Sequence, residues 1–498
     1  MNMLIKRLIK ITEENVFFNI SLDEGNLGYA DEQDCQVWKQ VIESPLIRFK
    51  SEGSMARQEV SEWNYEQWVR YIYGLVTRGI KYDLVKISIL LNKLCIEKEF
   101  PLVVHVLGTN GKGSVASMTA SGLSASGWKT GLFTSPHLTR ILERFRIDGE
   151  EIDENLFCSG MVELYPHIEC MGSDPEMGYP SFFEIMTALG LVVFRMAGCG
   201  AIVLEAGLGG RLDATNGCRT HITVITNVDY DHVKTLGPTL KAIAGEKAGA
   251  MRRGIPVVSN DPRPYVRRIL RRLAEDCGTS IHFAGSRVSP DSGIPQSVRV
   301  SGYESLGKLK MNLLGEHQME NGSTAVSVLE TLASLKYDID LERAVPGILQ
   351  AQWPGRLEWI SRNPDILLDG AHNLSGARAL SLFLAELVKK YRHVNCLMGV
   401  LGDKDVSGVF SEILPHADRV VLCRPPNWRA QDPEMNLDLA RTITSDSRVI
   451  SDPVKAYEYL LSRTSDRDLL IVCGSLYLVG EVRGHALRIA PDPCKVSR

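Results

Sequence analysis

The feature that most constrains the fold is a short apolar run followed at once by a glycine-rich turn and a helix-like segment. Residues 102–107 read LVVHVL, residues 108–114 read GTNGKGS, and residues 115–127 are rich in small side chains at helical spacing. A buried strand is therefore predicted to lead through a glycine turn into the N-terminus of a helix. This arrangement is typical of loops that bind nucleotide phosphates with backbone N–H groups and the positive end of the helix dipole.

Each residue of the turn is a candidate nucleotide ligand. Lys112 supplies a positive charge for phosphate, and the hydroxyl of Ser114 can reach a bound Mg²⁺. The turn departs from the ordinary pattern GxxxxGK[ST], because Val106 stands at the first glycine and Gly113 separates the lysine from the hydroxyl. The alternative interpretation is a glycine turn with a solvated lysine. The candidates are Gly108, Thr109, Asn110, Gly111, Lys112, Gly113 and Ser114.

Apolar strands and helix-like segments alternate through the rest of the chain. Strands are predicted at 129–133, 201–204 and 222–225, and a second series at 366–368, 394–398, 419–422 and 469–472. Such alternation predicts two α/β units, each a parallel sheet covered by helices. We place an N-terminal extension at 1–60, a first domain at 61–352 and a second at 353–498, with a helical pattern over 63–96 and the domain boundary near 351–361.

Composition excludes several classes of protein. Hydrophobic residues make up 44% of the 498 residues and charged residues 23%, which disfavours general disorder and coiled coil. The net charge of -4 gives no basic field for nucleic acid or an anionic membrane, and no apolar run approaches the roughly 20 residues of a spanning helix. The 11 cysteines are scattered without a CxxC pair, which favours a reducing cytoplasm over a zinc site or a disulfide framework. We interpret the basic, apolar start as a short amphipathic helix, with a transit peptide as the alternative.

A second segment points to the same edge of the first sheet. Residues 134–138 read TSPHL and follow the next predicted strand. Because parallel strands end at one edge, this turn should lie beside the phosphate loop. Ser135 is then a candidate Mg²⁺ or phosphate ligand, although an ordinary turn is the alternative.

Ten segments taken in order resemble the folylpolyglutamate synthase and dihydrofolate synthase family of the Mur ligase superfamily. The resemblance extends from about Trp63 to Arg483 and implies a P-loop-containing Mur-ligase-type domain followed by a smaller Rossmann-like domain. It also implies an ATP-dependent ligase that adds L-glutamate through an acyl phosphate. The segments are GTNGKGS, TSPHL, ERFRIDGE (143–150), LEAGLGGRLDATN (204–216), TNVDYDH (226–232), EKAG (246–249), GEHQMEN (315–321), WPGRLE (353–358), LLDGAHN (367–373) and GVLGDKD (399–405).

The resemblance implies metal ligands and a modified lysine in the first domain. Glu205 and His232 match the residues that hold Mg²⁺, one or two ions, beside Ser135 and Ser114. Lys247 matches the lysine that is carbamylated in the superfamily, a change that would replace a cation with an anion. The alternatives are a structural histidine and a surface lysine on a helix.

The resemblance also implies roles near and within the second domain. Arg356 and Asp369 match residues that contact the nucleotide, Asn321 matches an adenine contact, and His372 matches a residue at the reaction centre. Lys112, Lys247 and His372 are therefore the expected catalytic residues. For Asp369 and His372 the alternative is an ordinary helix cap and turn. Arg356 lies just past the domain joint, so domain closure would bring its guanidinium to bound phosphates.

The expected substrates are ATP, L-glutamate, and dihydropteroate or a reduced folate, and we expect a monomer. The patterns GTNGKGS and GLGGRLDATN resemble those of enzymes that use dihydropteroate, so dihydropteroate is favoured and tail extension stays open. Leu142 stands where the family often has asparagine, and Trp428 stands where proline is common.

Two rival interpretations are a Mur-type ligase for cell-wall precursors and a protein that binds nucleotide or nucleic acid without catalysis. GLGGRLDATN and DGAHN argue against the first. The second rests on residues 263–276, RPYVRRILRRLAED, which predict a basic amphipathic helix. Given the net negative charge, we favour a solvated helix face for that segment.

Overall fold

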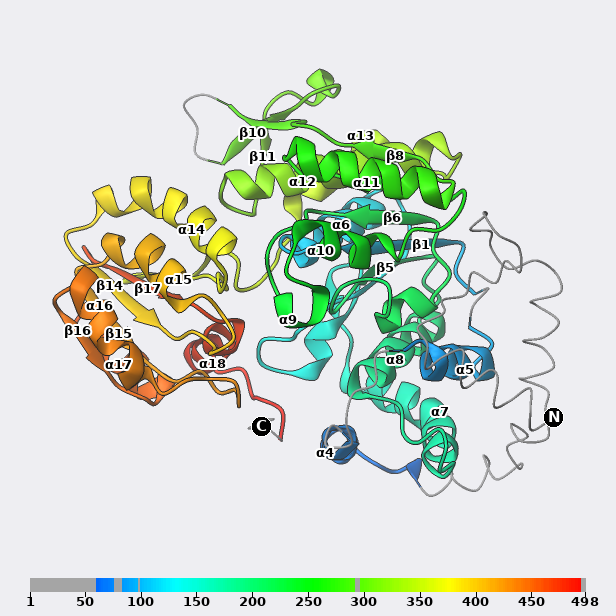
Figure 1. The fold of residues 1–498 in the computed structure, drawn as a ribbon, viewed down its shortest axis with the longest axis horizontal. Coiled ribbons are helices and arrows are strands. Elements are labelled where there is room, and N and C mark those ends of the chain that lie inside the picture. Colours follow the sequence, from blue (N-terminus) through cyan, green and yellow to red (C-terminus); the bar gives the residue numbers. More distant parts are fainter. Residues whose placement is uncertain (1–59, 76–82, 97–98, 292–295, 494–498) are drawn as a thin grey trace.

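The computed structural model describes residues 60–75, 83–96, 99–291 and 296–493. These residues form two α/β units that lie side by side, the first in blue to green and the second in yellow to red (Figure 1). The predicted N-terminal helix lies outside the described residues, as does the extension at 1–60 apart from its last residue.

An eight-stranded sheet forms the centre of the first unit, in the order β4-β3-β2-β5-β1-β6-β7-β8. Strands β2, β5, β1, β6, β7 and β8 are parallel, and β3 and β4 add an antiparallel edge. Every residue of β1 is buried, as expected for a strand covered on both faces. The strands are β1 (Leu102–Leu107), β2 (Thr130–Phe133), β3 (Phe145–Ile147), β4 (Glu150–Glu151), β5 (Ala201–Glu205), β6 (Ile222–Ile225), β7 (Val257–Ser259) and β8 (Ile281–Phe283).

Helices cover both faces of this sheet, so adjacent residues of one strand enter different cores. Val103 packs in the core formed with α4, α5, α7 and α8, and Val104 packs in the core formed with α6, α12 and α13. Helices α10 and α11 cover the end of the sheet near β6 and β7. The helices are α4 (Tyr65–Leu75), α5 (Val85–Lys93), α6 (Lys112–Ala125), α7 (Glu154–Gly172), α8 (Phe182–Met196), α9 (Val233–Leu236), α10 (Leu240–Ala248), α11 (Pro264–Cys277), α12 (Glu316–Ser334) and α13 (Leu341–Gln350).

A small antiparallel sheet lies beside α12, in the order β11-β10-β9. Its strands are β9 (Val288–Pro290), β10 (Ser297–Val300) and β11 (Leu309–Lys310). The alternating pattern did not predict this sheet, because its strands are short and carry little apolar periodicity.

The second unit is a six-stranded sheet in the order β12-β13-β17-β14-β15-β16. Only β12, at the edge, is antiparallel to its neighbour. The strands are β12 (Glu358–Arg362), β13 (Asp365–Leu368), β14 (Val394–Met398), β15 (Arg419–Leu422), β16 (Ser447–Val449) and β17 (Leu469–Cys473), and the helices are α14 (Leu374–Leu387), α15 (Val406–Ile413), α16 (Leu437–Ile443), α17 (Pro453–Leu461) and α18 (Leu476–Leu487).

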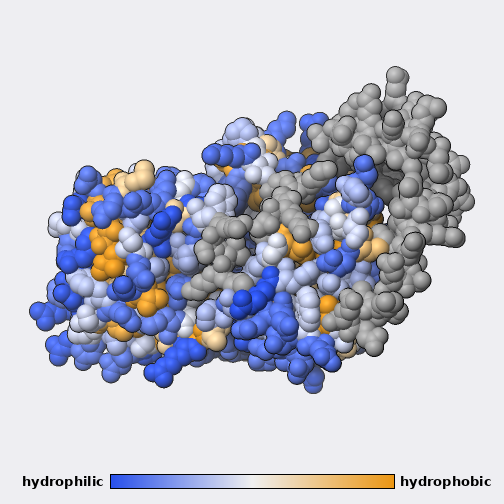
Figure 2. Space-filling model, turned by 90° about the horizontal axis from the view of Figure 1, so that it is seen from below, coloured by the Kyte–Doolittle hydropathy of each residue, from blue (hydrophilic) through white to orange (hydrophobic). Residues whose placement is uncertain are grey.

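All eight predicted strands are present, and the fold of two α/β units is confirmed. Three strands at the sheet margins, β3, β4 and β12, pair antiparallel and were not predicted. Two-residue turns join β3 to β4 and β12 to β13, which suits antiparallel pairing. The helical pattern over 63–96 corresponds to α4 and α5. Within the described ranges, no helix has both the length and the apolarity needed to cross a bilayer. The face seen from below is mainly hydrophilic, with its apolar residues in separate small patches (Figure 2).

Candidate active site

The phosphate loop joins β1 to α6 in a conformation that requires glycine. Gly111 has φ 79°, in the left-handed region, and forms the N-cap of α6 without a side-chain hydrogen bond to the helix. A Cβ at Gly111 would lie 2.5 Å from Oδ1 of Asn321, and one at Gly113 would lie 2.7 Å from the ring of Trp353. The close approach of Asn321 and Trp353 therefore leaves no room for a Cβ at either glycine, and the first N–H groups of α6 have no acceptor within the helix.

Residues after β6 hold this loop in place. The N–H groups of Thr109 and Asn110 donate to the carbonyl and the side-chain oxygen of Asn227, at 3.0 and 2.9 Å. The hydroxyl of Thr226 donates to the carbonyl of Asn110 at 2.6 Å. These bonds tie the loop to the residues that follow β6 and fix its conformation. Among the described residues, the Lys112 Nζ donates to the carbonyl of Thr109 at 3.2 Å and forms no ion pair, which leaves its charge available.

A buried carboxylate lies next to the phosphate loop. Glu205 ends β5, is 4% exposed, and accepts a hydrogen bond at Oε2 from the N–H of Ser135 at 3.0 Å. Burial raises its pKa, and the positive charges of Lys112, Arg356 and Arg144 oppose that rise. One carboxylate surrounded by three cations is the charge pattern of a site that receives polyanions.

His232 lies at the rim of the same site. It has φ 49°, its side chain is 35% exposed, and its Nε2 lies 3.9 Å from Oδ1 of Asp231. In the described chain, no three acidic, histidine or cysteine side chains gather as a metal cluster. The available donors are the carboxylate of Glu205, the hydroxyls of Ser114 and Ser135, and the imidazole of His232. This set fits Mg²⁺, which retains waters and takes part of its coordination from phosphates.

Lys247 is not the surface lysine of the alternative interpretation. It lies in α10, is 2% exposed, and ranks among the largest fully buried side chains. Burial, followed by the charge of Lys112, lowers its pKa to about 7. A large fraction of this amine is therefore neutral near neutral pH, which is the form that reacts with carbon dioxide.

The second unit presents Arg356 and the DGAHN loop across the cleft. Asp369 is 6% exposed, and its two oxygens accept the N–H groups of Leu357 and Ala371 at 2.9 and 2.8 Å. It therefore braces the segment that carries Arg356 against the loop that carries His372. The Nδ1 of His372 donates to the carbonyl of Gly370 at 2.8 Å, since a carbonyl only accepts, so Nε2 is left as the acceptor.

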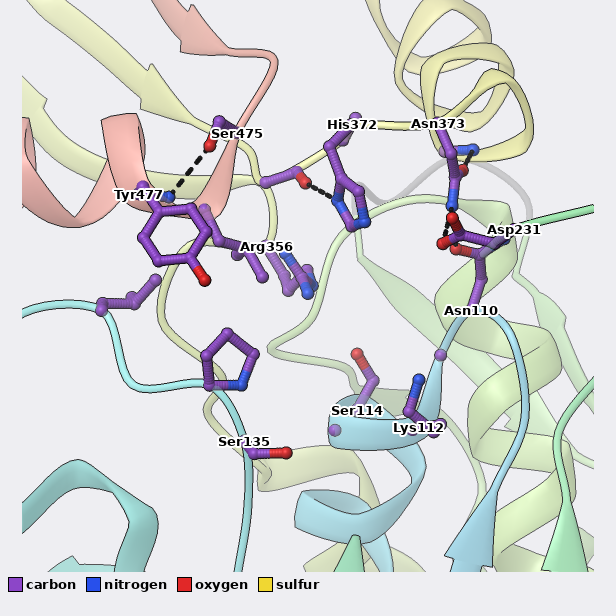
Figure 3. Close-up of a pocket in the computed structure, with 18 of the residues that line it drawn as sticks. Asn110, Lys112, Ser114, Ser135, Asp231, Arg356, His372, Asn373, Ser475 and Tyr477 are labelled. Atoms are coloured by element: carbon purple, nitrogen blue, oxygen red, sulfur yellow. Dashed lines mark hydrogen bonds between the residues drawn. The ribbon is translucent and has the colours of Figure 1, made fainter. Parts of the chain in front are cut away.

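Polar contacts from Asn373 and Lys404 tie the units together beside the phosphate loop. The Nδ2 of Asn373 donates to Oδ1 of Asn110 at 2.9 Å, and the Nζ of Lys404 lies 2.5 Å from Oδ1 of Asp231. Figure 3 shows Asn110 and Asn373 meeting at one side of the cleft, and Arg356 projecting toward Lys112 and Ser114. These contacts were not predicted, although Lys404 and Asp231 belong to the quoted segments GVLGDKD and TNVDYDH.

All the candidate residues predicted from the sequence line one cleft of about 2300 Å³ between the units. Asn321 lies against Gly111 and donates to Oε1 of Gln318 at 2.9 Å. Trp428 is 68% exposed and also lines the cleft. The individual roles of these residues remain predictions.

The basic helix of the rival interpretation is α11, and its arginines do not form one free face. The guanidinium groups of Arg267 and Arg271 lie over the ring of Phe283, at 5.1 and 5.4 Å from its centroid. Arg263 pairs with Asp261 and Asp229 at 2.8 and 3.3 Å.

Comparison with known proteins agrees with this geometry. The Mur ligase middle domain matches residues 106–329, and the Mur ligase glutamate ligase domain matches residues 355–476. The chain is 29% identical to a dihydrofolate synthase/folylpolyglutamate synthase of Bacillus subtilis, with 84% of this chain and 98% of that protein covered. It is 30% identical to a folylpolyglutamate synthase of Lacticaseibacillus casei, with the same coverage. The structure of Escherichia coli FolC in complex with DHPP and ADP matches with a TM-score of 0.74 and 26% identity, over 86% of this chain and 99% of that one. With both Mur ligase domains placed on its two units and these relatives aligned over nearly their whole length, the chain belongs to the folylpolyglutamate synthase and dihydrofolate synthase family of Mur ligases.

Proposed function

We infer that this protein is an ATP-dependent ligase that joins L-glutamate to dihydropteroate, or to a folate, through an acyl phosphate. The observation that carries this inference is the convergence of Lys112 and Arg356, from different units, on the cleft that holds Glu205. Neither cation forms an ion pair with a carboxylate in the part of the chain that is described. Both are therefore available for the phosphates of ATP.

The first step makes a poor acylating agent reactive. An oxygen of the substrate carboxylate attacks the γ-phosphorus of ATP, the bond to the β-phosphate oxygen breaks, and ADP leaves. The N–H groups at the start of α6 hold the phosphates, while Lys112 and Arg356 offset the charge on the oxygens in transfer. Mg²⁺, when held by Glu205, Ser114, Ser135 and His232, adds further neutralisation of phosphate charge.

The second step forms the amide. The neutral amine of glutamate attacks the acyl carbon, and phosphate departs from the tetrahedral intermediate with the oxygen that came from the substrate. The nitrogen gives up one proton in this step, and the departing phosphate takes it. His372 has its Nδ1–H engaged by the carbonyl of Gly370, so its Nε2 can accept a hydrogen bond from the attacking amine. Burial lowers the pKa of His372 to about 4, which keeps the ring neutral for this contact.

We propose that Lys247 acts in its carbamylated form. A carbamate on Lys247 would place a negative charge near the positive charge of Lys112. That positive charge already contributes to the lowered pKa of Lys247. Mass spectrometry of the intact protein before and after acid treatment tests this, because a carbamate adds the mass of carbon dioxide and is lost in acid.

Further proposals concern the organisation of the chain. We place the domains at 61–352 and 353–498 with an extension before them, because the first sheet ends before α13 and the second begins at β12. We propose a cytoplasmic monomer that binds neither nucleic acid nor membrane. The free state of the nine described cysteines supports a reducing compartment.

Product analysis tests the function. The purified protein is incubated with ATP, Mg²⁺, L-glutamate and either 7,8-dihydropteroate or a reduced folate monoglutamate, and products are identified by mass spectrometry. We expect ADP formation to require both a pteroyl acid and glutamate, with dihydrofolate as one product, and Lys112→Ala to abolish it. Turnover only with cell-wall precursors would support the rival ligase, and no substrate-dependent turnover would support a binding protein.

A further inference from the structure

Arg144 is a buried cation that makes no direct ion pair with a carboxylate among the described residues. It is 6% exposed and ends a 3-10 turn at Ile141–Arg144, immediately before β3. Its Nε–H donates to Nδ1 of His137 at 2.9 Å, and its guanidinium carbon lies 5.3 Å from the centroid of the Phe182 ring. Across the described residues it forms no ion pair with a carboxylate.

A buried guanidinium without a direct ion pair is costly. The charges of Glu205 and Glu143 act on Arg144 without an ion-pair contact, and burial still lowers its pKa. Arg144 lines the cleft together with Ser135 and Glu205, so an anion in the cleft would provide a direct counter-charge. With Nε committed to His137, the terminal nitrogens are the groups left for such an anion. Paired guanidinium nitrogens match the two oxygens of a carboxylate.

The surroundings of Arg144 distinguish it from the ATP-facing cations. Lys112 and Arg356 belong to the phosphate loop and the domain joint, whereas Arg144 lies on an aromatic side of the cleft. There Tyr73 and Phe182 are stacked, with centroids 5.6 Å apart and planes 10° apart. An aromatic wall suits a flat ring system, and a carboxylate carried by such a ring toward the phosphates would pass Arg144.

A chain of hydrogen bonds fixes the orientation of the guanidinium. Because His137 accepts from Arg144 at Nδ1, its proton resides on Nε2, which lies 3.3 Å from the hydroxyl of Tyr73. That hydroxyl in turn donates to Oδ2 of Asp492 at 3.4 Å. Asp492 is anchored by the hydroxyl of Tyr65 at 2.6 Å and by the N–H of Ile141 at 2.8 Å. The C-terminal segment thus braces the side chain that faces the cleft.

We propose that Arg144 binds the substrate carboxylate that accepts the phosphoryl group, and that His137 and Tyr73 position it. The proposal rests on the proposed function, since it takes a pteroyl acid as the ligand. It assigns Arg144 to recognition of the acid and leaves the phosphates of ATP to Lys112 and Arg356.

Binding of an acid and of its neutral amide tests the assignment. The dissociation constants of 7,8-dihydropteroate and of its carboxamide are measured by calorimetry with the full chain, in the presence of Mg²⁺ and a non-hydrolysable ATP analogue. We expect wild type to prefer the acid by about 10- to 100-fold, the range of a charge-assisted hydrogen bond. In Arg144→Gln the preference should fall to near unity, with the affinity for the ATP analogue unchanged. Arg144→Lys should retain an intermediate preference.

Matched variants separate positioning from loss of fold. Arg146→Gln removes an arginine two residues away that pairs with Glu151 at 2.9 Å and does not line the cleft, and it should keep the wild-type preference. His137→Phe should lower the acid preference while affinity for the amide is kept, which general damage to the site would not do.

The outcomes are distinguishable. Failure of wild type to bind either ligand refutes the proposed function. Equal binding of acid and amide by wild type refutes the role of Arg144 without any variant. The assignment is also overturned if Arg144→Gln keeps the wild-type preference for the acid over the amide. It is likewise overturned if this variant binds the ATP analogue more weakly while its preference for the acid is unchanged.

Discussion

Replacing Lys247 with methionine should stabilise the protein while abolishing ligation. The lysine is 2% exposed, and its pKa falls from 10.5 to about 7 on folding. At a pH between 7 and 10.5, Lys247 carries a proton in the unfolded chain but not in the folded chain, so the folded state is destabilised. At about 1.4 kcal/mol per pKa unit, the shift corresponds to roughly 5 kcal/mol as an upper bound at and below pH 7.

The sign of the pH dependence is the sharper test. The penalty is greatest below the folded pKa and disappears as pH approaches the unfolded pKa. The stability advantage of Lys247→Met should therefore shrink by about 1.4 kcal/mol per pH unit above pH 7.5. Urea unfolding of both proteins from pH 7 to 9.5, in buffers free of carbon dioxide to keep the amine unmodified, measures this difference.

Lys241→Met is the matched control, since Lys241 lies exposed on the same helix. Its stability should follow that of wild type at each pH. A difference between Lys247→Met and wild type that does not vary with pH would refute the reasoning, and full ligase activity in Lys247→Met would remove the lysine from the mechanism.

Three further predictions concern the cleft. Replacing Glu205 or His232 with alanine should raise the Mg²⁺ concentration required for half-maximal activity, and unchanged Mg²⁺ titrations in both variants would make these residues structural. Arg356→Ala should lower kcat on the order of 10²-fold with little change in thermal melting, and Arg356→Lys should recover only part of it; wild-type kcat in the alanine variant would contradict the contact with phosphate. Lys404→Met should destabilise the protein by roughly 3–5 kcal/mol, because it removes the cation of a buried ion pair with Asp231. Burial alone would raise the pKa of Asp231, but Lys404 outweighs burial and the pKa is lowered. The ion pair therefore stabilises the fold only while Asp231 is ionised, so the stability difference between wild type and Lys404→Met should diminish as pH falls below about 4. Acid unfolding curves of both proteins measure this difference.

The parts of the site that depend on local sequence could be predicted, because their geometry is encoded by adjacent residues. The phosphate loop is one example, since a strand, a glycine turn and a helix follow one another without interruption. Its details still required coordinates, because the glycine at 113 is explained by Trp353, a residue far along the chain.

The contacts that join the two units could not be predicted from local pattern. The bond from Lys404 to Asp231 spans 173 residues, and that from Asn373 to Asn110 spans 263. The role inferred for Arg144 was hidden for another reason. Its motif was recognised, but sequence does not show that a charged side chain is buried without a direct ion pair.

The most direct test of the acyl-phosphate mechanism follows an oxygen atom. The pteroyl substrate that turns over is labelled with ¹⁸O at both oxygens of the reacting carboxylate, and the released phosphate is analysed by mass spectrometry after ligation in unlabelled water. If the carboxylate attacks the γ-phosphorus, each phosphate carries one ¹⁸O and the new amide carbonyl keeps the other. Phosphate without ¹⁸O, formed at the rate of ligation, would contradict the mechanism.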